Sequence, residues 1–167
     1  MRKNKIMILG GARSGKTMLA NVLNGIPGLP RRTSHMVYGK YTLDVPGSYL
    51  ECPWMYQHPI AAQQDACCVL MLCAADMKKR SYPPGFAESF RIPVLGVISK
   101  VDLGEEGVRQ CEQALAAAGV KPPYHYLSVP TGVGVDRLKE TVFQLRQSVQ
   151  EKQGTVCQRK ENERDDG

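Results

Sequence analysis

The sequence has no long apolar run and no internal repeat. None of its 167 residues lies in a stretch approaching the ~20 apolar residues that a membrane-spanning helix needs. We therefore expect a cytoplasmic protein rather than an integral membrane protein. The missing repeat argues against solenoids and propellers. A hydrophobic fraction of 43% predicts one globular domain with a core of ordinary size.

The six cysteines form no C-x-x-C pair, and no cysteine–histidine cluster has the spacing of zinc ligands. In a cytoplasmic chain we expect all six to be reduced thiols. Cys67, Cys68 and Cys73 lie in or beside an apolar run, where cysteine acts as a small hydrophobe. A catalytic cysteine is therefore not expected.

The chain carries a net charge of +6 but no aromatic RNA-binding signature. Much of the excess lies at residues 1–5, 31–32 and 78–80. We expect no nucleic-acid partner. A basic balance also suits a protein that binds a nucleoside triphosphate or docks on an acidic surface.

A glycine-rich stretch separates an apolar segment at residues 5–9 from a helical pattern at 16–24. It fits G-x-x-x-x-G-K-[ST], the P-loop or Walker A pattern. Its amides are expected to cradle phosphate oxygens, with Lys16 reaching the β- and γ-phosphates and Thr17 binding Mg²⁺. The stretch predicts GTP or ATP as ligand and consists of Gly10, Gly11, Ala12, Arg13, Ser14, Gly15, Lys16 and Thr17.

The rest of the chain alternates strands with helices. This pattern predicts an α/β, three-layer P-loop NTPase fold, with a mostly parallel sheet, one antiparallel strand and helices on both faces. Residues 1–150 are expected to form the nucleotide-binding domain, and 151–167 a polar, disordered tail. We expect a hairpin at 36–45, strands at 66–75, 93–99 and 124–128, and helices at 104–118 and 135–149. Loops are expected at 48–64, with one helical turn near 60–64, and at 76–91.

Two further positions are expected to complete phosphate and Mg²⁺ binding. Asp44-Val45-Pro46-Gly47 fits the D-x-x-G pattern, in which the carboxylate holds Mg²⁺ through water and Gly47 offers its amide to the γ-phosphate. An ordinary turn after a strand is the alternative. Thr33 stands where Ras-like GTPases close a threonine over Mg²⁺. The metal set is therefore Thr17, Thr33 and Asp44, and the set acting on the γ-phosphate is Lys16, Thr33 and Gly47.

Two stretches are candidates for recognising the base. Ser99-Lys100-Val101-Asp102 resembles the N-K-x-D motif of GTPases, in which the aspartate accepts hydrogen bonds from guanine and the lysine packs over the base. Ser99 replaces the asparagine, which leaves adenine open. Ser128-Val129 resembles the S-A-x loop behind the base, and a plain strand-to-helix turn is its alternative.

Together these stretches resemble a small Ras-like P-loop GTPase of the EutP/PduV family. The likeness is most specific at Tyr82-Pro83-Pro84-Gly85-Phe86-Ala87, which is not a general GTPase feature, and it runs from about Lys5 to Leu145. It implies a role in ethanolamine or propanediol utilisation and in bacterial microcompartments, with shell proteins as partners. An acetate kinase activity has also been proposed for EutP-type members.

Three functions remain open from the sequence, which does not predict the oligomeric state. The leading one is a slow NTPase switch, because Ser48 stands where Ras-like enzymes have a water-orienting glutamine. The second is an ATP-dependent phosphotransferase to an acceptor such as acetate, with Arg13, Arg31 and His58 as candidate carboxylate ligands. The third is a non-catalytic protein that docks on a microcompartment shell.

Overall fold

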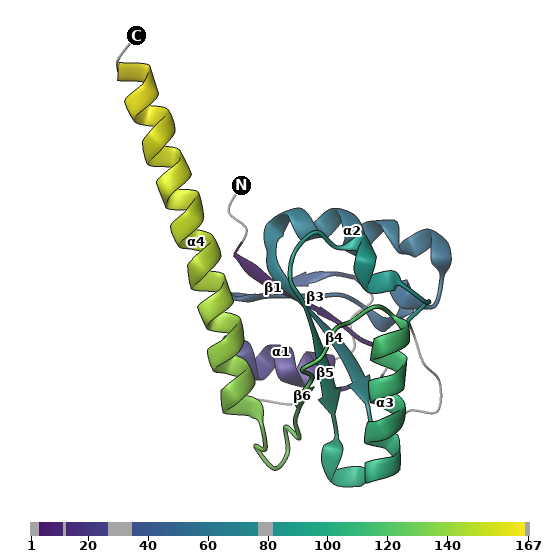
Figure 1. Ribbon diagram of the computed structural model, residues 1–167. Helices are drawn as coiled ribbons and strands as arrows, with labels where there is room; N and C mark the ends of the chain where they lie inside the picture. Colours follow the sequence, from purple (N-terminus) through teal and green to yellow (C-terminus); the bar gives the residue numbers. More distant parts are fainter. Residues whose placement is uncertain (1–3, 12, 27–34, 77–81, 166–167) are drawn as a thin grey trace.

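The computed structural model describes residues 4–11, 13–26, 35–76 and 82–165, and only the backbone from residue 156 onward. These residues include a six-stranded sheet in the order β2-β3-β1-β4-β5-β6 (Figure 1). The pairing of β2 with β3 is antiparallel, and the other pairings are parallel. The strands are β1 (Lys5–Leu9), β2 (Val37–Tyr38), β3 (Thr42–Asp44), β4 (Ala66–Ala74), β5 (Val94–Ser99) and β6 (His125–Tyr126).

Helices cover both faces of the sheet. Alternate residues of β1 point to opposite faces, with Ile6 and Ile8 in one core cluster and Met7 and Leu9 in the other. The first cluster includes residues of α1 (Lys16–Asn24) and α4 (Val135–Asp165), and the second residues of α3 (Glu105–Ala117). Burial on both faces explains why β1 and β4 are apolar along most of their length. The predicted three-layer α/β fold is confirmed.

The stretch expected as a loop at residues 48–64 contains more helix than its prolines suggested. It holds 3₁₀ turns at Gly47–Leu50 and Pro53–Met55, then α2 (Gln57–Ala62). Pro53 begins its turn, and Pro59 lies in the first turn of α2. Amide groups in a first turn have no intrahelical acceptor, so proline is tolerated there. The prolines therefore mark where these short helices begin.

The last helix is longer than the sequence pattern suggested. We expected it to end at Val149, but α4 continues to Asp165 through the stretch expected to be disordered. This stretch contains no proline and is rich in glutamate, lysine, arginine and glutamine, which favour helix when solvated. Its last turns stand clear of the sheet (Figure 1). The domain boundary at residue 150 stays a prediction.

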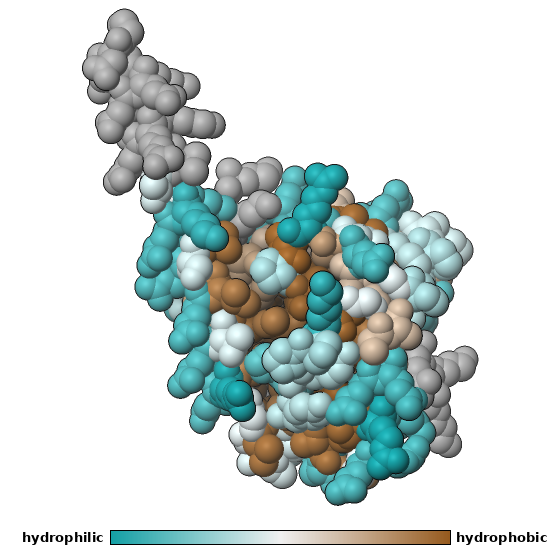
Figure 2. Space-filling model, in the orientation of Figure 1, coloured by the Kyte–Doolittle hydropathy of each residue, from teal (hydrophilic) through white to brown (hydrophobic). Residues whose placement is uncertain are grey.

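The surface beside α4 mixes polar and apolar character. Figure 2 shows hydrophilic side chains along α4, and hydrophobic residues gathered between α4 and α3. Strand β6 pairs with Val97 and Ile98 of β5. None of the described helices is both long and apolar enough to cross a membrane.

Candidate phosphate and nucleotide site

The glycine-rich stretch, here called the phosphate loop (residues 10–17), joins β1 to the first turn of α1. Gly15 and Arg13 both have left-handed backbones, with φ of 85° and 62°. Gly10 is required for a different reason, because a Cβ there would overlap the hydroxyl of Ser14. The loop is thus tightly folded against its own side chains. Ala12 lies outside the described residues.

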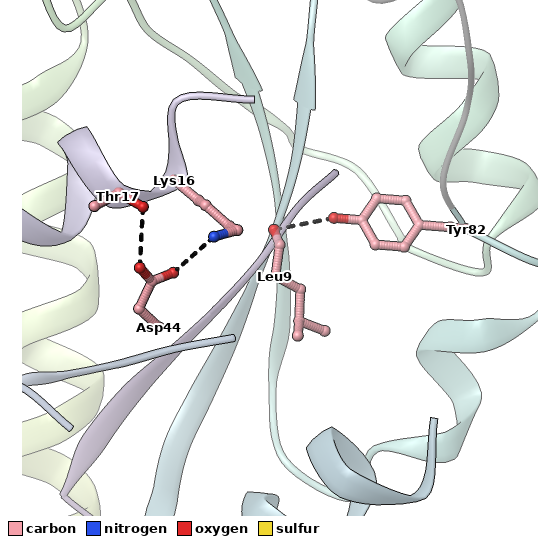
Figure 3. A network of polar contacts seen from close by, with 5 residues as sticks. All are labelled: Leu9, Lys16, Thr17, Asp44 and Tyr82. Carbon is pink, nitrogen blue, oxygen red and sulfur yellow. Dashed lines mark hydrogen bonds and ion pairs between the residues drawn. The ribbon is translucent and has the colours of Figure 1, made fainter. Parts of the chain in front are cut away.

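Two of the predicted phosphate and metal residues contact the carboxylate of a third (Figure 3). Lys16 Nζ lies 3.3 Å from Asp44 Oδ1, and Thr17 Oγ1 donates a hydrogen bond of 3.1 Å to Asp44 Oδ2. Asp44 is the last residue of β3 and pairs in register with Ile8 of β1. The carboxyl ends of two parallel strands therefore bring the D-x-x-G carboxylate to the phosphate loop.

This donor set fits Mg²⁺ bound together with a phosphorylated ligand. A hydroxyl and a carboxylate are hard oxygen ligands, the kind that Mg²⁺ prefers. No cluster of three or more histidine, cysteine, aspartate or glutamate residues occurs within the described ranges. Mg²⁺ commonly uses one or two carboxylates plus substrate phosphates as ligands, and Asp44 supplies one carboxylate here.

The segment after Asp44 holds Gly47 beside the same strand end. Val45 donates its backbone N–H to Ile8 at 3.2 Å, and Gly47 is buried at the start of its 3₁₀ turn. Ser48, at the position of the water-orienting glutamine, is exposed. Thr33 and Arg31 lie outside the described residues, so their predicted roles stay predictions.

Residues 99–102, here called the base loop, are tied directly to the phosphate loop. Ser99 Oγ donates a hydrogen bond of 2.7 Å to the carbonyl of Ser14. Lys100 Nζ donates one of 2.7 Å to the carbonyl of Arg13 and lies 3.0 Å from Asp76 Oδ2. Asp102 is exposed on the turn that follows β5. The two predicted motifs therefore form one continuous site.

The loop after β6 lies against the base loop through backbone contacts. Leu127 accepts the N–H of Val101 at 3.4 Å, and Ser128 donates its N–H to Val133 at 3.0 Å. Val129 is partly exposed. This arrangement brings the start of the Ser128-Val129 loop beside residues 99–102, and its role behind a base stays a prediction.

Two buried hydroxyls have no hydrogen-bond partner among the described side chains. They belong to Ser14 in the phosphate loop and Ser128 beside the base loop. An unsatisfied buried polar group costs about 1–3 kcal/mol, and native proteins have few of them. Both lie in the segments that sequence motifs assign to ligand binding.

Sequence reasoning missed two residues at this site, Asp76 and Tyr82. Asp76 follows β4 and pairs with Lys100. The Tyr82 hydroxyl lies 3.0 Å from the carbonyl oxygen of Leu9 and 2.8 Å from that of Leu72 (Figure 3 draws the first contact). Burial raises the pKa of Tyr82 well above its usual value, so the phenol stays a donor. The family-specific stretch 82–87 was the available signal, but it indicated no contact.

A family model for PduV-EutP, described as ethanolamine utilisation – propanediol utilisation, matches residues 3–144. The chain belongs to this family. A PduV-EutP relative, the propanediol utilization protein PduV of Citrobacter freundii, is 29% identical over 135 residues. The match covers 80% of this chain and 89% of the relative.

Solved GTP-binding proteins share the fold of this PduV-EutP chain. A probable GTP-binding protein EngB superposes with a TM-score of 0.62 at 18% identity, covering 86% of this chain and 99% of EngB. Elongation factor SelB of Methanococcus maripaludis, solved with the GTP analogue GppNHp, gives 0.63 at 22% identity, covering 87% of this chain. This chain spans 34% of SelB. At these identities the likeness shows the fold.

Proposed function

We propose that this chain binds a nucleoside triphosphate with Mg²⁺ at the phosphate loop and hydrolyses it slowly, as a nucleotide-dependent switch. The observation that carries the proposal is the convergence of Lys16 and Thr17 on Asp44. The three residues come from two motifs and are buried or partly buried, Lys16 and Thr17 at the end of the phosphate loop and Asp44 beside it. An ammonium, a hydroxyl and a carboxylate so placed match what Mg²⁺-triphosphate binding requires.

Each residue would have a separate task. Lys16 would exchange its partner, the Asp44 carboxylate, for the β- and γ-phosphate oxygens. Thr17 and Asp44 would hold Mg²⁺, directly and through water, while the backbone N–H groups of the phosphate loop donate hydrogen bonds to the phosphate oxygens. Mg²⁺, when bound, neutralises charge on the phosphates. Gly47 would offer its amide to the γ-phosphate, and Thr33 is proposed to close over it.

The proposal of slow hydrolysis rests on Ser48. Its short, exposed hydroxyl cannot reach as far as a glutamine side chain to orient an attacking water. Glu51 and His58 follow in the same segment and are also exposed. The alternative is transfer of the γ-phosphoryl group to an acceptor such as acetate. Measuring diphosphate formation with and without acetate distinguishes the two.

GTP is the ligand that the base loop favours, with ATP as the alternative. Ser99 retains a tie to the phosphate loop despite replacing the asparagine of the motif. Asp102 is proposed to accept hydrogen bonds from guanine, with Lys100 over the base and Ser128-Val129 behind it. The exposure of Asp102 leaves its carboxylate accessible to a ligand.

Family membership supports a role for this activity in ethanolamine or propanediol utilisation. Association with microcompartment shell proteins, with or without nucleotide turnover, stays a prediction. Its test is whether the Lys16→Ala variant still localises with the shell in cells.

Equilibrium binding to the parent and to Lys16→Ala tests the proposal. Loss of a charge-assisted contact worth about 1.5–3 kcal/mol predicts roughly 10- to 150-fold weaker triphosphate binding. Lys121→Ala, at an exposed lysine remote from the motifs in sequence, is the matched control and should bind like the parent. Equal affinities for parent and Lys16→Ala would refute the site, provided circular dichroism shows both folded.

A further inference from the structure

The family-specific stretch 82–87 is hydrogen-bonded to the end of α3. Gly85 donates its backbone N–H to Ala117 at 3.0 Å, and Ala87 donates to Ala118 at 2.8 Å. Both acceptors lie at the carboxyl end of α3. Gly85 has φ of 70°, which allows the turn that places Phe86 in the core. The stretch is therefore anchored at its centre.

One end of this stretch contacts the base of the phosphate loop. The Tyr82 hydroxyl is shared between the carbonyls of Leu9 and Leu72, in neighbouring parallel strands. Leu9 directly precedes Gly10, the first residue of the phosphate loop. A tyrosine hydroxyl has a single proton, so it bridges the two carbonyls as a shared or alternating donor. A displacement of the phosphate loop at Gly10 would therefore also move the Leu9 carbonyl that accepts the Tyr82 hydrogen bond.

The same stretch contacts the segment that follows Gly47. Phe86 stacks with Tyr82, with centroids 6.2 Å apart, and meets the Tyr56 ring edge-on at 5.2 Å. Tyr56 donates its hydroxyl to the carbonyl of Leu50 at 3.3 Å. Leu50 ends the 3₁₀ turn that begins at Gly47. Packed rings therefore connect the base of the phosphate loop to the D-x-x-G segment.

We propose that Tyr82, Phe86 and Tyr56 form an aromatic link that couples the phosphate loop to residues 47–56, with Tyr82 as a positioning residue. Packed cores transmit displacement because they are close to incompressible. The link ends at Tyr56, two residues after Trp54 in the chain, and Trp54 is 71% exposed. The state of the phosphate site is thereby reported on the surface at Trp54. This inference rests on the proposed nucleotide binding.

Trp54 provides the measurement, because it is the single tryptophan of the chain. Its fluorescence is recorded at saturating GDP and at saturating GppNHp with Mg²⁺, so that the comparison does not depend on affinity. The parent is expected to show different spectra in the two states. Tyr82→Phe removes the hydroxyl bridge but keeps the ring, and should reduce this difference at least twofold. Tyr56→Phe should reduce it in the same way.

Tyr124→Phe is the matched control. It removes a tyrosine hydroxyl that donates to the carbonyl of Val120 at 2.8 Å. The side chain of Tyr124 packs against the same core cluster as that of Tyr82. A general loss of packing would affect it as much as Tyr82→Phe. Tyr124→Phe is expected to keep the parent's full fluorescence difference, and melting temperatures monitor folding of all variants.

The possible outcomes separate the link from the binding proposal. If the parent binds both nucleotides but Trp54 does not distinguish them, the link is overturned and binding stands. An undiminished difference in both Tyr82→Phe and Tyr56→Phe, or an equal decrease in Tyr124→Phe, overturns it as well. If isothermal titration shows that the parent binds neither nucleotide, the proposed function fails, and the link fails with it.

Discussion

The hydroxyl of Ser99 donates a hydrogen bond of 2.7 Å to the backbone carbonyl of Ser14, which lies 85 residues earlier in the chain. Ser99 is 4% exposed, so this bond lies in a region of weak solvent competition. It joins the base loop to the phosphate loop at the position where the GTPase motif has asparagine. With its single donor, serine thus keeps one hydrogen bond between the two loops.

Removing this hydroxyl should therefore weaken nucleotide binding without abolishing the fold. For Ser99→Ala we expect roughly 5- to 15-fold lower nucleotide affinity, because a buried hydrogen bond contributes about 1 kcal/mol or somewhat more. Fluorescence titration with a labelled nucleotide measures the change. Ser148→Ala removes an exposed hydroxyl bonded to its own helix and should bind like the parent. Unchanged affinity in Ser99→Ala would mean that the bond does not position the base loop.

Asp102 is the residue proposed to recognise guanine, and its substitution tests guanine against adenine as the base. In Asp102→Asn, GTP affinity should fall at least tenfold while ATP affinity stays constant, since the guanine-binding carboxylate is lost. Parallel titrations with GTP and ATP measure both effects. Asp136→Asn, an exposed aspartate in the first turn of α4, is the control. Tighter binding of ATP in the parent, unaffected by Asp102→Asn, would contradict guanine recognition.

Two glycines within helices should respond oppositely to alanine. A Cβ on Gly107 of α3 would overlap the carbonyl oxygen of Ala75, whereas one on Gly154 of α4 meets nothing within 4 Å. Gly154→Ala should stabilise by about 0.5–1 kcal/mol through helix propensity. Gly107→Ala should instead destabilise by about 1–3 kcal/mol through overpacking. Urea denaturation measures both, and stabilisation by Gly107→Ala would show that α3 does not pack this closely on the end of β4.

His125 should make the protein sensitive to mild acid. Burial, and secondarily the positive charge of Arg137, lower the pKa of His125 from its usual 6.5. The unfolded chain therefore takes up this proton first, and stability falls as the pH drops from 6.5 through the lower folded pKa. Between about pH 7.5 and 5.5, the melting temperature of His125→Gln should therefore fall less than that of the parent.

The exposed His58 supplies the control for this experiment. His58→Gln makes the same change of residue at an exposed position and controls for the loss of a histidine as such. Equal acid sensitivity of the parent and His125→Gln would show that another group controls this pH range.

The sequence predicted the parts of this protein that depend on local pattern. The mostly parallel sheet follows from alternating strands and helices, and its antiparallel strand from the early hairpin. The convergence of Lys16, Thr17 and Asp44 also follows, since the motifs come at the carboxyl ends of neighbouring parallel strands. Each of these motifs has a fixed spacing, so a few residues are enough to identify it in the sequence.

Contacts between distant residues could not be predicted in the same way. Tyr82 contacts the carbonyl of Leu9 across 73 positions, and no spacing rule relates a tyrosine to a backbone oxygen. Asp76 could be expected near a strand end, but its pairing with Lys100 depends on the turn that gives Lys100 a left-handed backbone. The extension of α4 was missed because a polar composition is compatible with both disorder and a solvated helix.

The most direct test of the central claim is the Mg²⁺ dependence of triphosphate binding. GTP is titrated into the parent and into Thr17→Val with and without Mg²⁺, because valine keeps the shape of threonine but lacks its hydroxyl. We expect Mg²⁺ to tighten GTP binding to the parent at least tenfold and to have little effect in Thr17→Val. No saturable binding to the parent, or the same Mg²⁺ effect in both proteins, would contradict the central claim.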